Sequence, residues 1–379
     1  MKLNSLKLIN FRNYHNVKFN PSSGINILYG FNGSGKTNIV EAIYILALSK
    51  SFRTLNEKIL INNNEQKAKI EGNFFVKNRE SSFKIFFDGD GKTVFINNEK
   101  IKLLSDYISK INIVLFSPSD LKIIKDSPGF RRKFLNIEIS QFNKEYLFCI
   151  ANYNKLLKQR NAYLKQLSTN YNNSFEYLDI ITKKIIDIGL KINKYRTSFV
   201  DKLNSYISDF YFKIAGVNNV KIVYDSSFND EDASSILEAF KKNRIRELNF
   251  GKTLIGIHLD DFKILIDDLD IKDYGSEGQQ KNAVLAIKFA EIELFKKVKG
   301  ESPILILDDL FSELDLQKIN NIFKLISDGI QTFITTTDVN KIDKEIIKKS
   351  KLIKITNGCV EEVLKWITSN IIMIVIFRF

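Results

Sequence analysis

Residues 30–37 have the types and the spacing of a loop that binds phosphate groups. They read Gly30-Phe31-Asn32-Gly33-Ser34-Gly35-Lys36-Thr37 and match the pattern G-x-x-x-x-G-K-[ST]. Glycines allow backbone N–H groups to turn inward around phosphate oxygens. Lys36 is expected to reach the β- and γ-phosphates of a nucleotide, and the Thr37 hydroxyl is expected to ligate Mg²⁺. The loop therefore predicts a site for ATP and Mg²⁺, and the alternative is a glycine-rich turn that only caps a helix.

The elements on both sides of the loop favour the phosphate site. Residues 24–29 are predicted to form a short buried strand, and residues 37–49 a helix. The apolar residues of this helix recur on one face, at Ile39, Ala42, Ile43, Leu46 and Ala47. A helix that begins at the end of a glycine loop adds partial positive charge where an anion would bind.

Two adjacent carboxylates end a second apolar segment, which runs from Ser302 to Asp309. A buried parallel strand delivers such side chains at its carboxyl end, where α/β sheets bind their ligands. Asp308 is expected to hold Mg²⁺, directly or through water, and Asp309 to orient or deprotonate the attacking water. The polar residues Ser312 to Asp315 are expected to turn the chain into another helix, and Gln331–Thr335 to form a further strand.

The segment Gly275-Ser276-Glu277-Gly278-Gln279-Gln280 precedes a predicted helix that runs to Lys297. Ser276 and Gln279 have the spacing of a capping box, in which each side chain satisfies the other's backbone N–H group. A capped helix N-terminus with a glycine for close approach is also an anion site. Ser276, Gly278 and Gln279 are therefore candidates to receive the γ-phosphate of a nucleotide held by a second subunit.

The composition is that of an ordinary globular protein with an excess of positive charge. The chain has 379 residues, a hydrophobic content of 44%, and a net charge of +13. This charge favours a polyanion such as nucleic acid as the partner, unless it reflects only a general richness in lysine.

Two cysteines, Cys149 and Cys359, suit a reducing cytosol. No signal peptide is evident, and the apolar run of residues 371–377 is shorter than the roughly 20 residues that span a bilayer. We expect an edge strand or a disordered tail there, and no membrane.

The order of predicted elements indicates an α/β fold with antiparallel strands beside a parallel sheet. A hairpin is expected in residues 2–19, and further strands in residues 68–76, 82–88, 93–96 and 111–116. A helix is expected from Asp120 and another from Pro128. Apolar residues at helical spacing from Tyr146 to Leu157 and from Leu178 to Phe199 predict an antiparallel helical hairpin, with Ser168–Ser174 as its loop. Residues 220–224 are expected to form a strand and residues 233–248 a helix.

Two polar groups have alternative interpretations. The cations of Arg131-Arg132-Lys133 could contact DNA phosphate or form internal ion pairs. His258, Asp260 and Asp261 could form a metal site, but one histidine beside adjacent acids is better explained as a turn with structural hydrogen bonds. Arg12, in the turn of the first hairpin, could lie near the nucleotide or be solvated.

The ordered motifs together resemble the RecF family, in the SMC-like group of ABC-type ATPases. The separation of Lys36 from Ser276 is too wide for a transporter subunit and too narrow for a true SMC protein. The resemblance extends along nearly the whole chain. It rests on Asn10–Tyr14, Gly30–Asn38, Ser51–Arg53, Phe116–Pro118, Ser127-Pro128, Arg131-Arg132, Gln159–Asn161, Thr253-Leu254, His258, Asp260-Asp261, Ser276–Gln280 and Leu307–Asp315.

The resemblance implies an ABC-type P-loop ATPase head with an inserted helical lobe. The head would comprise residues 1–120 and 251–365, the helical lobe residues 121–250, and an apolar tail residues 366–379. Two copies would enclose two ATP molecules, clamp DNA at gaps or junctions, and hydrolyse ATP slowly, as a weak DNA-stimulated ATPase. Members of the family work with RecR and RecO in the bacterial cytoplasm to load RecA on gapped DNA, in recombinational repair, replication restart and the SOS response.

Several positions depart from the family pattern. The family usually has an acid where Ser119 stands, glycine at Asp126 and aspartate at Asn136. It usually has proline and arginine where Ile257 and Leu259 stand, and glutamine at Glu277. An SMC-like ATPase that serves a nuclease partner is the main alternative function. A transport ATPase subunit is disfavoured by the long insertion and the basic charge.

Overall fold

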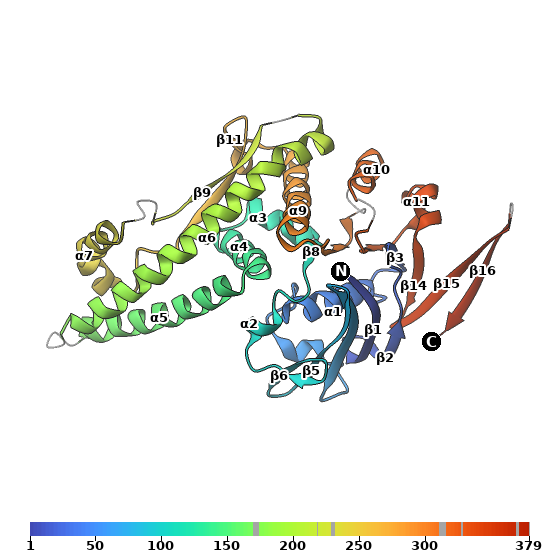
Figure 1. The fold of residues 1–379 in the computed structure, drawn as a ribbon, viewed down its shortest axis with the longest axis horizontal. Coiled ribbons are helices and arrows are strands. Elements are labelled where there is room, and N and C mark those ends of the chain that lie inside the picture. Colours follow the sequence, from blue (N-terminus) through green and yellow to red (C-terminus); the bar gives the residue numbers. More distant parts are fainter. Residues whose placement is uncertain are drawn as a thin grey trace. The chain divides into compact units, whose positions relative to one another are not determined.

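The computed structural model describes residues 1–169, 174–217, 219–228, 232–310, 316–326, 329–368 and 371–378. The chain folds into two compact units (Figure 1). The first comprises Met1–Asp120 and Lys288–Phe379, and the second comprises Leu121–Ile287. The chain therefore returns to the first unit at Lys288, whereas the expected return is at residue 251. The difference arises because residues 261–270 pair with a strand of the second unit.

A six-stranded antiparallel sheet forms one part of the first unit. Its strand order is β2-β1-β4-β5-β6-β7, and the predicted first hairpin is its β1–β2 pair. The strands are β1 Lys2–Phe11, β2 Tyr14–Phe19, β4 Ala68–Val76, β5 Arg79–Asp88, β6 Gly91–Ile96 and β7 Glu99–Lys100. Leu6, Leu8, Ile70, Phe74 and Ile85 point to the buried face.

A seven-stranded sheet forms the other part, in the order β16-β15-β14-β3-β13-β12-β8. Strands β14, β3, β13, β12 and β8 run parallel, and β15 and β16 are antiparallel additions at one edge. The strands are β3 Ile25–Tyr29, β8 Ile113–Phe116, β12 Ile304–Leu307, β13 Thr332–Thr336, β14 Lys351–Thr356, β15 Cys359–Thr368 and β16 Ile371–Arg378. The apolar C-terminal segment is thus an edge strand, one of its two expected forms.

Helix α1, Lys36–Leu48, packs against strands of both sheets. We expected one buried face, but Val40, Tyr44 and Ile45 are buried as well as the predicted residues. A helix that packs against a sheet on each of two sides is buried around most of its circumference. The predicted single buried face therefore included too few of the buried residues of α1. Shorter elements of this unit are α2 Leu104–Tyr107, α10 Leu316–Leu325, α11 Lys344–Lys349 and the 3₁₀ turns Glu57–Leu60, Pro118–Leu121 and Val339–Lys341.

The second unit is mostly helical. Figure 1 shows the long helices α5 and α6 lying side by side, as the predicted helical hairpin requires. Its helices are α3 Lys122–Lys125, α4 Pro128–Phe142, α5 Lys144–Thr169, α6 Glu176–Ala215, α7 Ala233–Phe250 and α8 Ile271–Tyr274. Strands β9 Val220–Asp225, β10 Asp261–Ile266 and β11 Leu269–Asp270 form a small antiparallel sheet.

Helix α9, Glu277–Lys299, begins in the second unit and continues into the first. The helix expected from Asp120 is instead the 3₁₀ turn Pro118–Leu121 followed by the single turn α3. It ends before Ser127-Pro128, because a proline disfavours helical conformation in the residue that precedes it. No helix within the described ranges is long and apolar enough to cross a membrane.

Candidate nucleotide site

The phosphate loop connects the carboxyl end of β3 with the N-terminus of α1, as predicted. Gly30 has a φ of 154°, and a Cβ atom there would lie 2.2 Å from the backbone oxygen of Ile355. Gly35 has a φ of 116° and serves as the N-cap residue of α1, so no side chain caps this helix. The positive φ of Gly35 and the crowding at Gly30 explain why glycine is required at both ends of the loop.

The turn between β1 and β2 holds the loop in place. The Tyr14 hydroxyl donates a hydrogen bond to the Gly35 carbonyl at 2.9 Å, and the Asn13 side-chain amide donates to the Ser34 carbonyl at 3.0 Å. Asn38 in turn donates to the side-chain oxygen of Asn13 at 2.8 Å. The bonds from Tyr14 and Asn13 use carbonyl oxygens of the loop. They therefore direct its backbone without occupying the N–H groups that would face a phosphate.

Lys36 is 8% exposed, and its ammonium lies over the loop. It donates hydrogen bonds to the carbonyls of Gly30, at 2.8 Å, and Phe31, at 2.9 Å. Burial lowers the pKa of Lys36, while the nearby carboxylates of Asp309 and Asp308 act in the opposite direction. An ammonium that is partly desolvated and close to two acids can exchange its carbonyl contacts for phosphate oxygens.

Asp308 follows β12 and meets the first turn of α1. Its Oδ1 atom accepts hydrogen bonds from the Thr37 hydroxyl at 3.0 Å and from the Thr335 hydroxyl of β13 at 2.8 Å. Thr37 and Asp308, 271 positions apart in sequence, are therefore brought together as the sequence predicts. A carboxylate and a hydroxyl oxygen are the ligand types that Mg²⁺ prefers, so the residues present fit this ion.

Burial raises the pKa of Asp308, although the hydrogen bonds from Thr335 and Thr37 oppose this effect. Asp309 has a left-handed φ of 52°, and its backbone N–H donates to the Thr335 hydroxyl at 2.8 Å. Positive φ is uncommon for a residue other than glycine and indicates a constrained position. Thr335 thus fixes both acids. The strand that carries Thr335 is predicted from sequence, but no local pattern indicates that Thr335 belongs to the site.

A buried glutamate on α1 is a second feature that sequence reasoning missed. The Arg12 guanidinium donates two hydrogen bonds to the Glu41 carboxylate, at 2.8 and 3.0 Å, and Arg53 contacts the same carboxylate at 3.4 Å. The Ser51 hydroxyl also donates to Glu41 at 2.5 Å. Arg12 is therefore ion-paired within the head rather than free in solvent. One signal in the sequence pointed to this cluster. Two of the segments that match the family pattern, Asn10–Tyr14 and Ser51–Arg53, contain the residues that contact Glu41.

The candidate signature turn in the second unit forms the predicted capping box. The backbone N–H of Ser276 donates to Gln279 Oε1 at 2.8 Å, and that of Gln279 donates to Ser276 Oγ at 3.3 Å. A Cβ atom at Gly278 would meet only Ser276 Oγ, at 4.0 Å, which is an ordinary van der Waals contact. Glu277 forms an ion pair with Lys281 at 3.3 Å and lies 4.0 Å from Lys125. These lysines offset the extra negative charge that Glu277 brings to the turn.

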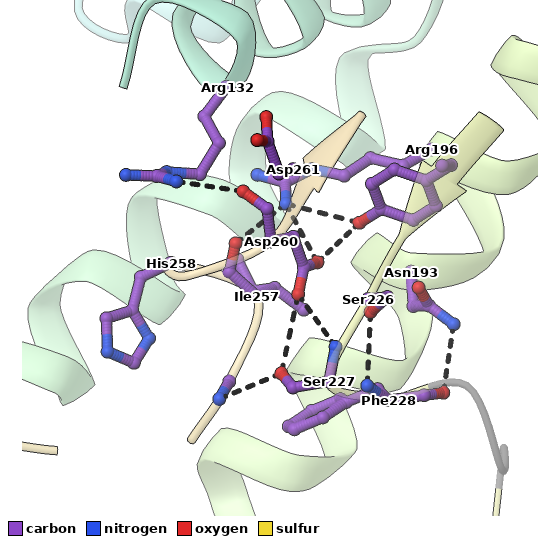
Figure 2. Close-up of polar contacts among 12 residues, drawn as sticks. Arg132, Asn193, Arg196, Ser226, Ser227, Phe228, Ile257, His258, Asp260 and Asp261 are labelled. Atoms are coloured by element: carbon purple, nitrogen blue, oxygen red, sulfur yellow. Dashed lines mark hydrogen bonds and ion pairs between the residues drawn. The ribbon is translucent and has the colours of Figure 1, made fainter. Parts of the chain in front are cut away.

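The histidine and acids that could have formed a metal site have protein partners instead. Figure 2 shows the partners of Asp260, which contacts Arg196 at 3.2 Å and accepts hydrogen bonds from Tyr224 and the backbone of Ser227. His258 Nε2 faces the Thr253 carbonyl at 3.2 Å, so this nitrogen carries the proton and Nδ1 accepts from Tyr153 at 2.9 Å. Burial lowers the pKa of His258, which agrees with a neutral ring.

The basic cluster of α4 is also largely internal. Arg131 holds Asp261 through two hydrogen bonds, at 2.5 and 2.9 Å, and Arg132 donates to the Asp260 carbonyl at 2.8 Å. For these two arginines, the structure favours internal pairing over contact with DNA. The segment Ser312–Asp315, expected to follow the double acid as a turn, lies outside the described residues.

Three kinds of comparison with known proteins agree on a family. The family model "RecF/RecN/SMC N terminal domain" matches residues 2–361. The chain is 37% identical to the "DNA replication and repair protein RecF" of Listeria monocytogenes, over 96% of this chain and 100% of that protein. The protein of the same name from Clostridium botulinum is 39% identical, over 94% and 99%. This chain belongs to the RecF family.

Solved structures agree with that assignment. A structure described as the recombination mediator protein RecF-ATPrS in the RecFOR pathway has a TM-score of 0.87 and 32% identity, and covers 95% of this chain and 98% of that one. A RecF-ATP structure has a TM-score of 0.88 and 31% identity, over 96% and 97%. An SMC head bound to part of ScpA, at 17% identity and a TM-score of 0.54, shares the fold alone. The expected fold class, an ABC-type ATPase head with helical content, is confirmed.

Proposed function

We propose that this protein is an ATP-dependent DNA-binding protein of RecF type. Two copies would associate when ATP binds, clamp DNA at gaps or junctions, and promote RecA loading in recombinational repair, replication restart and the SOS response. The observation that carries the proposal is the meeting of Thr37 and Asp308 at 3.0 Å beside the phosphate loop. The match to RecF proteins over nearly the full chain supports the choice of DNA as the partner.

Each site residue has a role that follows from its position. Gly30, Phe31, Asn32, Gly33, Ser34, Gly35, Lys36 and Thr37 would hold the phosphates of ATP. Thr37 and Asp308 would hold Mg²⁺, which supplies charge neutralisation at the phosphates when bound. Asp309 would orient or deprotonate the attacking water. Hydrolysis would give ADP and phosphate, as a weak DNA-stimulated activity.

The signature turn would act on the second copy. In the capping box, Ser276 and Gln279 satisfy two N–H groups at the start of α9. The absence of a side chain at Gly278 would let a phosphate of the partner's nucleotide approach the helix N-terminus. Because neither copy would then have a complete site alone, ATP would stabilise the dimer, and hydrolysis would release it. This dependence on a second copy is what would turn nucleotide binding into a clamp.

The wider setting follows from the relatives. The names of the related proteins refer to DNA replication and repair and to the RecFOR pathway. We therefore infer that mediators of RecR and RecO type are partners and that the protein acts in the cytoplasm. The net charge of +13 suits contact with backbone phosphates, which is largely independent of sequence and weakens as salt rises.

The test measures DNA binding and oligomer mass on the same samples. Gapped duplex would be titrated at several salt concentrations with ATP, with ADP, and with ATP plus Lys36→Ala; Lys110→Ala, which removes an exposed lysine outside the site, is the matched control. The proposal expects dimers and tight, salt-sensitive binding with ATP alone, both lost in Lys36→Ala and both retained in Lys110→Ala. If ATP changes neither mass nor DNA affinity, the clamp is wrong, and an ATPase that serves a protein partner such as a nuclease is the better explanation.

A further inference from the structure

The six-stranded sheet has one face that the core does not use. Its buried face carries apolar residues that pack toward α1, as the alternating burial of β1, β4 and β5 shows. The residues between them point to the other side. On an exposed antiparallel face, polar side chains are the usual occupants. Here lysines and phenylalanines share the face.

The strand registers align these residues in two rows across the sheet. Lys7 lies opposite Lys18 and Glu71, Glu71 opposite Lys84, Lys84 opposite Phe95, and Phe95 opposite Lys100. The first row is therefore Lys18, Lys7, Glu71, Lys84, Phe95 and Lys100, with one residue from each strand. The second row, two residues along, is Asn16, Ile9, Lys69, Phe86 and Thr93. We call these two rows the platform.

The two aromatic residues lie beside each other on the neighbouring strands β5 and β6, toward the β7 end of the platform. The rings of Phe86 and Phe95 meet edge to face, with centroids 5.5 Å apart. The Lys69 ammonium lies 5.4 Å from the centroid of the Phe86 ring. Phe86 remains 37% exposed. An exposed phenyl group beside cations is the arrangement that stacks a nucleic-acid base while its phosphate is neutralised.

Charge on the platform is strongly positive. It carries five lysines, Lys7, Lys18, Lys69, Lys84 and Lys100, and a single acid, Glu71. Glu71 holds Lys69 at 2.6 Å and Lys84 at 3.1 Å. Partial burial would raise the pKa of Glu71, but the hydrogen bonds and charges of these lysines outweigh it and lower the pKa. Glu71 therefore remains charged at neutral pH and restrains two of the five cations.

We propose that the platform binds single-stranded nucleic acid, with its lysines on the phosphates and with Phe86 and Phe95 stacked on bases. Six strands at a spacing of about 4.8 Å give a face about 24 Å wide, which suits a short run of nucleotides. A duplex would use the lysines alone, because its bases are already stacked on one another. The inference deepens the proposed DNA-binding function and rests on it for the class of partner. None of the platform residues belongs to the phosphate loop or the signature turn.

The experiment separates the platform from the ATP clamp by omitting nucleotide. The full chain would be titrated with labelled 12-mers of dT and of rU and with a 12-bp duplex, at several salt concentrations. Phe86→Leu/Phe95→Leu keeps apolar side chains but removes the stacking rings; Phe148→Leu, an exposed phenylalanine of the second unit, is the control. We expect dT binding to weaken about tenfold in the double variant, and duplex binding to change less than about twofold.

A second variant tests the electrostatics in the opposite direction. Glu71→Gln frees Lys69 and Lys84, so single strands should bind a few-fold more tightly and with a steeper dependence on salt. Lys110→Ala, which removes an exposed lysine outside the platform, should leave this binding unchanged. Because the titrations contain no nucleotide, the platform proposal can hold even if the clamp proposal fails. Comparison of dT with rU would show which sugar the platform prefers. The proposal is overturned if the double phenylalanine variant binds dT as tightly as the wild type, if duplex binding falls equally, or if Glu71→Gln weakens binding.

Discussion

Two clusters of charged residues, one in each unit, use similar groups in opposite ways. In the second unit, Arg196 and Asp260 are both almost fully buried, and each has several partners. Arg196 donates to the Ile257 carbonyl at 2.7 Å and to Asn136 Oδ1 at 3.1 Å, while Asp260 also accepts from Tyr224 and Ser227. The charges of this cluster are satisfied within the protein.

The cluster at the phosphate loop is organised differently. Asp308 is buried, but among the described residues its hydrogen bonds come from the uncharged hydroxyls of Thr37 and Thr335. Burial also raises its pKa. Lys36 contacts backbone carbonyls rather than an acid. A buried carboxylate without a guanidinium costs folding free energy, and a cation that binds there would recover it. A cluster whose charges are satisfied within the protein therefore indicates a structural role, and a cluster whose charge is incompletely compensated indicates a site for a ligand.

The largest expected effect comes from breaking the satisfied cluster. Arg196→Met leaves the Asp260 carboxylate buried without its cation, so the free energy of unfolding should fall by about 3–5 kcal/mol. Urea denaturation followed by circular dichroism measures this loss. The double variant Arg196→Met/Asp260→Asn removes both charges and should recover part of it. The single variant Asp260→Asn completes the comparison. If the loss of stability in the double variant equals the sum of the losses in the two single variants, the residues are not coupled, and the contrast between the clusters is wrong.

The second prediction concerns the incompletely compensated cluster. Asp308→Asn keeps an oxygen that can accept from Thr37 and Thr335 but removes the charge. ATP hydrolysis should fall by about 100-fold or more, since the side chain would no longer hold Mg²⁺. The free energy of unfolding without nucleotide should stay the same or rise. Steady-state phosphate release and denaturation on the same preparation test both parts, and a clear loss of stability would contradict the comparison.

The stability gain of Asp308→Asn should also depend on pH. The folded state raises the pKa of Asp308, so the unfolded state loses this proton first as pH rises. The wild type therefore loses stability as pH rises from the ordinary aspartate pKa, about 3.9, through the raised value. The variant does not titrate at this position. Its advantage should be largest at neutral pH and should vanish in acid, as a series of denaturation curves would show.

The sequence predicted the phosphate loop, the double acid and the capping box because each depends on residues close together in the chain. It also placed β3, α1 and β12 in the order that brings Thr37 to Asp308. Thr335 and Glu41 were not predicted as site residues because their roles depend on strand pairing and on a helix buried between two sheets. Their hydrogen bonds join residues that are distant in sequence, and no spacing rule identifies such partners.

The second unit shows the same limit. Local spacing predicted the helical hairpin and the start of α4 at Pro128, but left open whether Arg131 meets DNA or an internal acid. The choice depends on Asp261, which is 130 positions away. Strand β10 was not predicted either, because its alternation becomes recognisable only once β9 is known to pair with it.

The smallest effect should come from the turn that braces the loop. Tyr14→Phe removes one buried hydrogen bond, to the Gly35 carbonyl, and should lower the free energy of unfolding by about 1 kcal/mol. Tyr107→Phe is a matched control, because the Tyr107 hydroxyl is equally buried and donates to the Leu46 carbonyl of the same helix, away from the loop. Both variants should lose similar stability, but only Tyr14→Phe should weaken ATP binding, by a few-fold in calorimetry. Equal ATP affinities would mean that the turn supports the fold and does not shape the phosphate site.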